Sequence, residues 1–371
     1  MRLVTAAVVR QTGGEFHLED LQLEDPRQTE VVVRILGSGI CHTDVSARDQ
    51  VLPFRLPAVL GHEGAGVVEA VGSAVTRVRR GDHVVLSFAH CGACTNCSSE
   101  HPAYCTKTNR LNFGGARADG SAVQRDAAGA VVSSRFIGQS AFASCVLVDE
   151  RTVIVVPSDL PVELMGPLGC SMQTGAGAVL NVLRAEPGSS IAIFGSGAVG
   201  LAAVMASRIA ECATIIAIDL NDDRLRSARE LGATHTFNAT QTDCVDAVRA
   251  VMSGRGVRYA VECTGRASVL GQALEVLDIC GTCALVGAAD PSALAPINMN
   301  AMLRGRSLLG VTEGDTVPQQ FIPRLIDWWR EGRFPFDRLV TYFALSQINE
   351  AVRACASGTV IKAIVRPQQR P

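Results

Sequence analysis

The sequence predicts an α/β protein in which a doubly wound parallel sheet follows a region made mostly of β-strands. Residues 1–150 contain short apolar or alternating runs separated by Gly, Pro and Asp. From about residue 171, strand-like and helix-like runs alternate, and a glycine-rich turn links the first such strand to the first helix. A chain of 371 residues is too long for one ordinary hydrophobic core, so we expect two domains.

The composition indicates a compact globular protein, since 47% of the residues are hydrophobic and only 19% are charged. A formal net charge of −2 offers no basic surplus for a nucleic acid or an anionic membrane. The first residues lack a small-residue cleavage site, and the longest apolar run, 191–207, is too short and glycine-rich for a bilayer span. We therefore expect a cytoplasmic protein with no nucleic-acid or membrane partner. In such a protein, the presence of 13 cysteines indicates metal ligands more than disulfides.

The first region is expected to be β-rich and to end in a loop. Its strands are predicted at Val31–Ile35, Gly66–Val71, His83–Leu86 and Cys145–Val148. The segment Arg110–Arg135 contains NFGGARADGS and little periodicity, which predicts a long surface loop.

The second region is expected to alternate strands and helices. Strands are predicted at Ile191–Phe194, Thr214–Asp219, Thr234–Phe237, Tyr259–Cys263, Cys283–Val286 and Ser307–Val311. Helices are predicted at Asp222–Leu231, Asp243–Ser253, Ser268–Leu277 and, in the tail, Pro318–Glu331. Asp222 is expected to cap the first of these helices, and Gly232 to end it. Six strands with intervening helices form a doubly wound sheet.

The turn after Phe194 has the spacing of a dinucleotide-binding motif. Gly195, Gly197 and Gly200 form G-x-G-x-x-G, with Ala198 and Val199 inside it. The first glycine permits a tight turn, the second lets the backbone approach a pyrophosphate, and the third lets the helix pack on the strand. The helix N-terminus supplies N–H groups for the phosphates. The alternative is a βαβ unit that binds no nucleotide, but such a unit does not require the acidic residue that ends its second strand, Asp219.

Asp219 ends the second strand of this unit, where a carboxylate accepts hydrogen bonds from the ribose hydroxyls of NAD. The same charge repels a 2′-phosphate, so NAD is expected over NADP. Arg224 weakens this preference slightly and is a further candidate for cofactor binding.

Four cysteines in one loop predict a structural metal site. Cys91, Cys94, Cys97 and Cys105 are spaced C-x2-C-x2-C-x7-C. Four thiolates complete the tetrahedral shell of Zn²⁺ and leave no position for substrate. An iron–sulfur cluster is the alternative, but there the fourth cysteine normally follows after three residues and precedes Pro. Four unrelated buried thiols are the remaining alternative.

Three dispersed residues could form a second metal site with an open position. Cys41 lies in GICHTD, His62 in LGHEGAG and Cys170 in PLGCSMQTG. Two thiolates and one imidazole leave the fourth position of a zinc ion free for water or an alcohol. Taken singly, each cysteine could be a small core residue and His62 a hydrogen-bonded structural histidine. Spacing alone leaves both interpretations open.

These motifs together resemble the zinc-dependent medium-chain alcohol dehydrogenases over nearly the whole chain. The resemblance rests on GHEGAGVVEAVG, the four-cysteine lobe, Cys170, and GSGAVG with Asp219, all in the order of that family. The strings CHTDVSARDQ, LPAVLGHEG, VVLSFAHCGAC, NFGGARADGS and FIGQSAFAS are most similar to the aryl (benzyl) alcohol dehydrogenases. The resemblance implies a GroES-like β-barrel domain formed by 1–170 and 313–371, with an NAD-binding Rossmann domain, 171–312, between them.

The resemblance also implies roles near the second metal site. A zinc ion held by Cys41, His62 and Cys170 would act as a Lewis acid on the alcohol. Thr43 would take the proton of the alcohol and pass it to the cofactor ribose, although an N-cap threonine is the alternative. Asp44 would fix the ring of His62, and Glu63 would ligate the metal transiently or make a structural hydrogen bond.

Further positions follow from the same resemblance. His42 and Lys362 match positions that bind the pyrophosphate, a solvated surface charge being the alternative for Lys362, and Val286 is expected to contact the cofactor. Leu52, Phe88, Phe136 and Thr174 match substrate-lining positions, with core packing as the alternative for the phenylalanines. Many relatives end the proton relay in a histidine where this chain has Ser46, and a serine can relay a proton but cannot act as a base near pH 7.

The expected function is the NAD-linked, reversible oxidation of an aryl or similarly unsaturated primary alcohol to its aldehyde, with one catalytic and one structural zinc. A thiol-dependent formaldehyde dehydrogenase and a terpene or allylic alcohol dehydrogenase are the alternatives. A zinc-free quinone reductase or crystallin-like protein would have no reason to keep both metal sets. A homodimer is expected, with a tetramer as alternative, because the edge strand Ser307–Val311 and the apolar segment Ile297–Leu303 lack an obvious cover.

Overall fold

The computed structural model describes residues 1–367, which divide into two compact units. The first unit comprises Met1–Cys170, Val317–Pro323 and the described residues from Asp337 onward, and the second comprises Ser171–Thr316 and Arg324–Phe336. The expected boundaries assigned all of 313–371 to the first domain, whereas Glu313–Thr316 and Arg324–Phe336 group with the second unit. One reason is a hydrogen bond from Thr316 Oγ1 to Gln173 Oε1 (3.0 Å), both inside the second unit.

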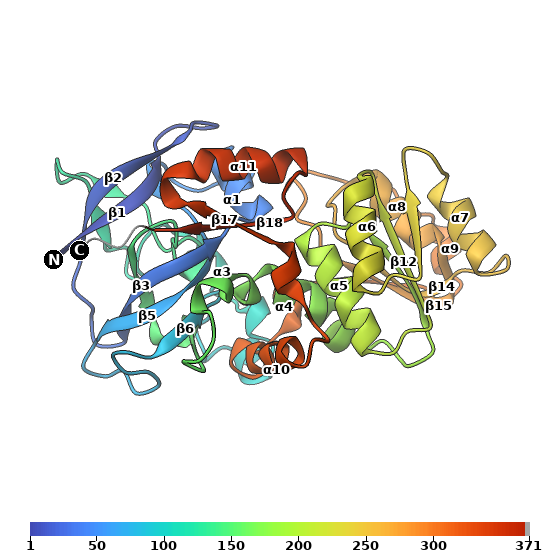
Figure 1. The fold of residues 1–371 in the computed structure, drawn as a ribbon, viewed down its shortest axis with the longest axis horizontal. Helices are drawn as coiled ribbons and strands as arrows, with labels where there is room; N and C mark the ends of the chain where they lie inside the picture. Colours follow the sequence, from blue (N-terminus) through green and yellow to red (C-terminus); the bar gives the residue numbers. More distant parts are fainter. Residues whose placement is uncertain (368–371) are drawn as a thin grey trace. The chain divides into compact units, whose positions relative to one another are not determined.

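The first unit is built from two antiparallel-rich sheets (Figure 1). The strands of the smaller sheet are β4 (Ala58–Val59), β1 (Arg2–Val9), β2 (Phe16–Leu23), β7 (Gln124–Arg125) and β8 (Val131–Val132), in that order. The larger sheet has the order β10 (Val153–Val156), β6 (His83–Leu86), β5 (Glu63–Val71), β3 (Glu30–Gly39), β18 (Lys362–Arg366) and β17 (Val340–Ala344), with β9 (Cys145–Asp149) also pairing with β3. Strand β3 therefore forms the centre of this unit, and Val31, Val33 and Ile35 on it are fully buried.

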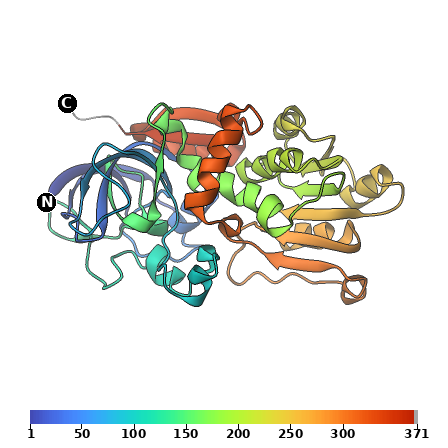
Figure 2. The same cartoon turned by 90° about the horizontal axis from the view of Figure 1, so that it is seen from below.

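Short helices complete the first unit. They are α1 (His42–Arg48), α2 (Thr95–Ser98), α3 (Thr108–Phe113) and α11 (Ile348–Ser357). Figure 2 shows α2 and α3, in teal, as a small lobe. The four strands expected in this region are present, but β3 extends past Ile35 to Gly39 because its last residues still pair with β5, Gly39 facing Glu63.

The expectation of a long surface loop at Arg110–Arg135 is wrong. The segment contains part of α3 and the strands β7 and β8, and β7 extends the smaller sheet by pairing Gln124 with Leu23 of β2. Arg117 within it is only 6% exposed. Local periodicity could not reveal this order because it comes from contacts with residues about a hundred positions away.

The second unit is a parallel sheet with helices on it (Figure 1). Its strands in spatial order are β13 (His235–Asn238), β12 (Thr214–Asp219), β11 (Ser190–Phe194), β14 (Val257–Glu262), β15 (Leu277–Leu285) and β16 (Ser307–Gly310). The interiors of β11 and β12 are continuous buried apolar runs, as expected for a parallel sheet covered on both faces. The order reverses between β11 and β14, which is where doubly wound sheets bind ligands beyond the strand ends.

All expected helices of the remaining chain are present, with ends shifted by up to two residues, and two short helices, Ser171–Gly177 and Met299–Met302, are not among those expected. The helices are α4 (Ser171–Gly177), α5 (Ala198–Ile209), α6 (Asp222–Leu231), α7 (Cys244–Val251), α8 (Ala267–Glu275), α9 (Met299–Met302) and α10 (Pro318–Arg330). The N-cap of α6 is Asn221 rather than Asp222, because Asn221 Oδ1 accepts from the N–H groups of Asp223 (2.8 Å) and Arg224 (3.2 Å). Gly232 ends α6 with a φ of +125°, as expected. Within residues 1–367, no helix has both the length and the apolar character of a membrane span.

Candidate active site

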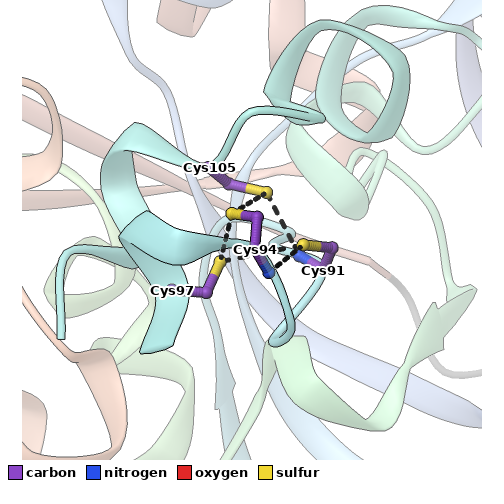
Figure 3. Close-up of side chains that lie close together, drawn as sticks. All are labelled: Cys91, Cys94, Cys97 and Cys105. Atoms are coloured by element: carbon purple, nitrogen blue, oxygen red, sulfur yellow. Dashed lines mark hydrogen bonds between the residues drawn. The ribbon is translucent and has the colours of Figure 1, made fainter. Parts of the chain in front are cut away.

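The four-cysteine lobe brings its sulfur atoms together as a metal site requires (Figure 3). Cys94 Sγ lies 3.5 Å from Cys97 Sγ and 4.0 Å from Cys105 Sγ, and Cys91 Sγ lies 3.9 Å from Cys97 Sγ. These separations are too long for a disulfide and close to the ~3.8 Å between sulfurs on one tetrahedral zinc ion. Helix α2 starts directly after Cys94, so one helical turn fixes the spacing of Cys94 and Cys97.

Backbone N–H groups favour thiolates in this lobe. The N–H of Cys94 donates to Cys91 Sγ (3.3 Å) and the N–H of Cys91 donates to Cys105 Sγ (3.3 Å). Hydrogen bonds from backbone N–H groups of Cys97 and Thr106 lower the pKa of Cys94 to about 5, whereas burial and the neighbouring Cys94 raise the pKa of Cys97 to about 12. Four such thiols become thiolates together only around a cation, so the donor set fits zinc.

The three dispersed candidates also meet. The ligand atoms of Cys41, His62 and Cys170 all lie within 4.8 Å of one another, and His62 is 1% exposed. Cys41 directly precedes α1, His62 directly precedes β5, and Cys170 follows a 3₁₀ turn at Gly166–Gly169. Each residue thus lies at the end of an element, where rigid neighbours fix its backbone.

Asp44 prepares His62 to bind a metal through Nε2. Its Oδ1 lies 2.9 Å from His62 Nδ1 and accepts from the Gly61 N–H (3.0 Å), while its Oδ2 accepts from the Cys41 N–H (2.9 Å). A carboxylate accepts hydrogen bonds, so Nδ1 is the donor in this contact and Nε2 is the ring nitrogen left for a metal ion. His62 Nε2 is buried and makes no hydrogen bond within residues 1–367, which fits a metal ligand.

Charge around this centre further favours a thiolate. The pKa of the Cys41 thiol lies well below its usual range because the neighbouring Cys170 thiol and the His62 ring stabilise its charged form against the effect of burial. A deprotonated sulfur is the form that binds zinc. The residues present therefore fit a zinc ion with three protein ligands.

Lys362 is buried, which excludes one of its two expected roles, while the role at the pyrophosphate stays a prediction. It is 2% exposed, and its Nζ donates to both carboxylate oxygens of Glu63 (2.9 Å each) and to the Ile40 carbonyl (2.9 Å). The alternative of a solvated surface charge is therefore wrong. Because these contacts use the three protons of the ammonium group, Lys362 and Glu63 form a buried ion pair beside His62.

Helix α1 carries the candidate proton relay. Thr43 is its second residue, and Thr43 Oγ1 lies 3.6 Å from Cys41 Sγ. The N-cap is Cys41, so the alternative role of Thr43 as N-cap is wrong. Ser46 lies three residues further along, on the same face of the helix as Thr43. His42 is the exposed first residue of α1.

The candidate pocket residues are placed in different surroundings. Phe136 is fully buried, and its ring meets the rings of His62 (centroids 5.6 Å apart) and Phe54 (5.0 Å) edge to face. Phe88 is 5% exposed, and Leu52 is a partly buried side chain at the edge of the same core. Thr174 belongs to the second unit, where its hydroxyl donates to Glu313 Oε2 (3.4 Å).

The glycine motif of the second unit has the geometry that a dinucleotide turn needs. Gly195 has a φ of +93°, and a Cβ on Gly200 would lie 1.7 Å from the Gly195 carbonyl oxygen. A Cβ on Gly197 would meet nothing within 4 Å, so the first turn of α5, which also contains Ala198 and Val199, begins beside open space. Asp219 closes the turn, its Oδ2 accepting from the Ser196 N–H (2.6 Å).

The other cofactor candidates of the second unit lie at or shortly after the carboxyl ends of strands β12 and β15 of its sheet. Asp219 Oδ1 accepts from the N–H of Leu220 (2.8 Å), at the carboxyl end of β12. Arg224 lies in the first turn of α6, and its buried Nε has no hydrogen-bond partner in the described part of the chain. Val286 directly follows β15 and donates its N–H to the Glu262 carbonyl (2.8 Å).

Sequence reasoning missed Gln139. It is 2% exposed, and its side-chain amide donates to the carbonyl of His62 (2.8 Å) and of Ser87 (3.1 Å). A glutamine between Gly138 and Ser140 predicts an ordinary polar loop, so no local signal pointed to this contact.

Two protein families match this chain. Residues 27–158 match alcohol dehydrogenase GroES-like domains, and residues 198–331 match zinc-binding dehydrogenases. The chain is 45% identical over 363 residues to geraniol dehydrogenase of Castellaniella defragrans, covering 97% of this chain and 96% of that protein.

Solved structures agree with this match. An alcohol dehydrogenase zinc-binding domain protein from Burkholderia ambifaria is 51% identical with a TM-score of 0.97, over 99% of this chain and 100% of that chain. A benzyl alcohol dehydrogenase from Acinetobacter calcoaceticus is 41% identical with a TM-score of 0.96, over 99% and 100%. Fold and donor sets thus define a two-domain, zinc-binding dehydrogenase. The chain belongs to the zinc-dependent medium-chain alcohol dehydrogenase family, and the fold and family predicted from the sequence are confirmed.

Proposed function

We propose that the protein catalyses the NAD-linked, reversible oxidation of a primary allylic or benzylic alcohol to its aldehyde. The observation that carries this proposal is the open donor set of Cys41, His62 and Cys170, whose ligand atoms lie within 4.8 Å of one another. Three protein ligands leave one tetrahedral position for substrate, whereas the separate four-cysteine set is closed. A catalytic and a structural zinc per chain follow from this difference.

The residues around the open set would act on the proton and on the geometry. A zinc ion held there supplies Lewis-acid polarisation of the alcohol oxygen. Asp44 keeps His62 in the metal-binding tautomer, and Thr43 accepts the hydroxyl proton of the substrate. Ser46, on the same face of α1, passes that proton to water. A nicotinamide bound at the second unit would accept the hydride of the carbinol carbon, so that a hydride and a separate hydroxyl proton leave the alcohol to give the aldehyde.

NAD is proposed as the acceptor on the geometry of the second unit. The glycine turn opens at Gly197, and Asp219 places a carboxylate at the end of β12. A negative charge at this point favours ribose hydroxyls and penalises a 2′-phosphate.

The proposed substrate class rests on the two named relatives. Geraniol and benzyl alcohol are both primary alcohols with a π system next to the carbinol carbon, and both give conjugated aldehydes. A shared fold and 41–45% identity to both relatives support an unsaturated alcohol without choosing between a terpene and an aryl group.

Matched pairs of alcohols test this proposal, with NADH absorbance as the readout. Geraniol is compared with citronellol, and benzyl alcohol with cyclohexylmethanol, so that each pair differs in unsaturation and little in size. We expect kcat/KM to be higher for the unsaturated alcohol of at least one pair, and benzyl alcohol to exceed ethanol by about ten- to a hundredfold from ring burial. Equal kcat/KM values within both pairs would contradict the proposed substrate class. Activity only with formaldehyde plus a thiol would instead identify a thiol-dependent formaldehyde dehydrogenase.

A further inference from the structure

The loop Arg135–Ser140 of the first unit has an unfavourable backbone. The φ angles are +60° at Arg135, +46° at Ile137, +76° at Gly138 and +64° at Ser140. Non-glycine residues rarely adopt positive φ, and a β-branched residue such as isoleucine least of all. Such a backbone persists only where the surrounding structure holds it, and strained segments of this kind gather at functional sites.

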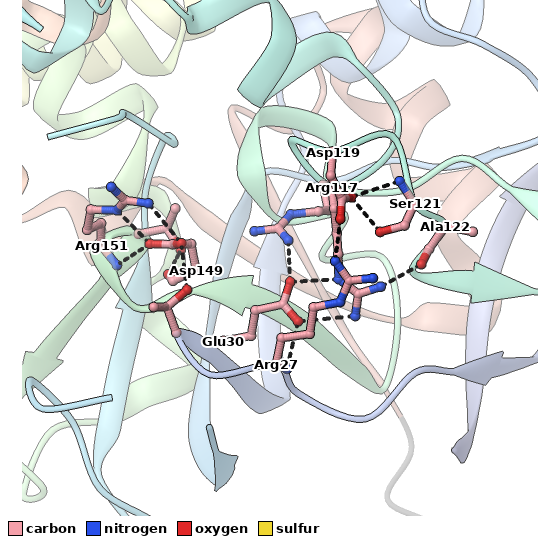
Figure 4. Close-up of polar contacts among 11 residues, drawn as sticks. Arg27, Glu30, Arg117, Asp119, Ser121, Ala122, Asp149 and Arg151 are labelled. Atoms are coloured by element: carbon pink, nitrogen blue, oxygen red, sulfur yellow. Dashed lines mark hydrogen bonds and ion pairs between the residues drawn. The ribbon is translucent and has the colours of Figure 1, made fainter. Parts of the chain in front are cut away.

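Both ends of this loop are held by buried polar groups. Arg135 Nη1 donates to Glu30 Oε1 (2.7 Å), and Glu30 is itself held by Arg117 through two bonds of 2.9 and 3.1 Å (Figure 4). At the other end, Ser140 Oγ donates to the Val59 carbonyl (2.6 Å). These contacts fix the loop against β3 and the segment before His62.

The loop presents Gln139 to the backbone of the candidate metal ligand His62 and of Gly64, two residues later. Gln139 Nε2 donates to the His62 carbonyl (2.8 Å), and Gln139 Oε1 accepts from the Gly64 N–H (3.1 Å). Because an amide side chain is planar, these two bonds together define where residues 62–64 can lie.

The same amide reaches the segment that leads to the third ligand. Gln139 Nε2 also donates to the Ser87 carbonyl (3.1 Å), and Ser87 Oγ donates to the carbonyl of Gly169 (2.8 Å), the residue before Cys170. One buried side chain and one hydroxyl therefore connect the segments carrying His62 and Cys170.

We propose that Gln139 is a positioning residue for the three-ligand metal centre. Its side chain fixes the distance between the backbone of His62 and the segment containing Ser87, which in turn contacts Gly169. At this distance His62 Nε2 and Cys170 Sγ can bind the same ion. Asp44 sets the rotation of the His62 ring, while Gln139 sets the position of its backbone. The inference rests on the proposed metal centre but not on the proposed substrate.

The test replaces Gln139 by methionine, which keeps the length of the side chain and removes its hydrogen bonds. Zinc affinity is measured on the full-length protein by competition with a chromophoric chelator, together with the thermal midpoint. We expect the dissociation constant of the three-ligand site to rise about 10- to 100-fold, as for other residues that orient metal ligands. The four-cysteine site should keep its affinity.

Asn349→Leu is the matched control. Asn349 also holds a backbone segment through its side-chain amide, accepting from the Phe16 N–H (2.9 Å) and donating to the Phe16 carbonyl (2.9 Å), and Phe16 lies in β2, which carries none of the candidate ligands. This variant should lower the thermal midpoint without changing either zinc affinity. Gln139→Glu, which keeps an acceptor for Gly64 but loses both donors, should resemble Gln139→Met in zinc affinity.

Wild-type zinc affinity in Gln139→Met, with a thermal loss like that of Asn349→Leu, would overturn the proposal. If Gln139→Met does not fold, Ser87→Ala takes its place, because it removes the hydroxyl bond to Gly169. It should weaken the three-ligand site alone, and unchanged affinity there would overturn the proposal. An unmodified protein with no zinc at the three-ligand site would instead contradict the proposed function.

Discussion

At the scale of single residues, Asp44 connects two of the three candidate zinc ligands, Cys41 and His62. Its carboxylate binds the N–H of Cys41 and the ring of His62, so the start of α1 and the start of β5 are fixed together. The single side chain of Asp44 therefore both caps helix α1 and orients the candidate metal ligand His62. The neighbouring residue, Thr43, is available for chemistry because the cap is made by others.

Thr43 is predicted to carry the proton. Thr43→Ala should lower kcat/KM for alcohol oxidation about 10²- to 10⁴-fold, the range typical of general acid–base groups. Thr43→Ser, which keeps the hydroxyl, is the control and should retain most activity. Ser46→Ala should cost far less because water can replace it, and Ser46→His should raise the rate below pH 7. Full activity in Thr43→Ala would exclude this relay.

Asp219 is predicted to set the cofactor preference. Asp219→Gly should weaken the use of NAD and narrow the ratio of kcat/KM for NAD over NADP, because a charge that repels the 2′-phosphate is lost. Asp219 also accepts from the Ser196 N–H, so Asp219→Asn separates the effect of charge from that of the turn. Equal use of both cofactors by the unmodified enzyme would contradict the role of this carboxylate.

At the scale of elements, the two metal sets are predicted to separate by function. Cys41→Ala should abolish turnover and leave a folded protein, since its element α1 is capped through Asp44. Cys97→Ala should lower the thermal midpoint or the yield, because a closed metal site contributes its binding energy to local folding. Cys280→Ala, at an exposed cysteine, is the control. Similar behaviour of the first two variants would argue against a catalytic and a structural site.

Glu30 connects β3 to the loop at Arg135 and is predicted to stabilise the first unit in a pH-dependent way. Burial raises the pKa of Glu30, but the bonds from Arg117 and from the Arg27 N–H and the charge of Arg135 outweigh it and lower the pKa. Glu30→Gln should reduce the unfolding free energy by about 3 kcal/mol at pH 7, since the buried guanidinium group of Arg117 and the partly buried one of Arg135 lose their charged partner.

The sign of the pH dependence follows from the lowered pKa. The stabilisation is complete above the pKa of the unfolded glutamate, about 4.3, and is lost as the pH falls through the lower folded value. Thermal midpoints of the wild type and Glu30→Gln should therefore differ at pH 7 and converge in acid. Glu15→Gln, which removes an exposed pair with Arg353, should differ little at any pH. A constant difference between wild type and Glu30→Gln would contradict this account.

At the scale of the whole molecule, a homodimer is predicted. Met299 and Leu303 are more than 80% exposed, and β16 beside them is the last strand of the parallel sheet in the described chain. An isologous pairing would cover both the apolar side chains and the strand edge. Light scattering at micromolar concentration should show a dimer, and Leu303→Asp should shift it toward monomer. Leu3→Asp, at another exposed leucine, is the control, and a monomeric wild type would contradict the prediction.

The sequence by itself determined the features that depend on residues close together in the chain. The glycine spacing, the cysteine spacing and the apolar runs of β11 and β12 follow from local chemistry, because a tight turn, a tetrahedral ion and a buried strand each restrict nearby residues. Resemblance then joined Cys41, His62 and Cys170 into one hypothesis. The tertiary structure decided what depends on distant neighbours: the ordered segment around Arg117, the burial of Lys362 on Glu63, and Gln139 at the backbone of His62. No local pattern encodes these contacts, because each joins a polar side chain to a partner that only folding brings near.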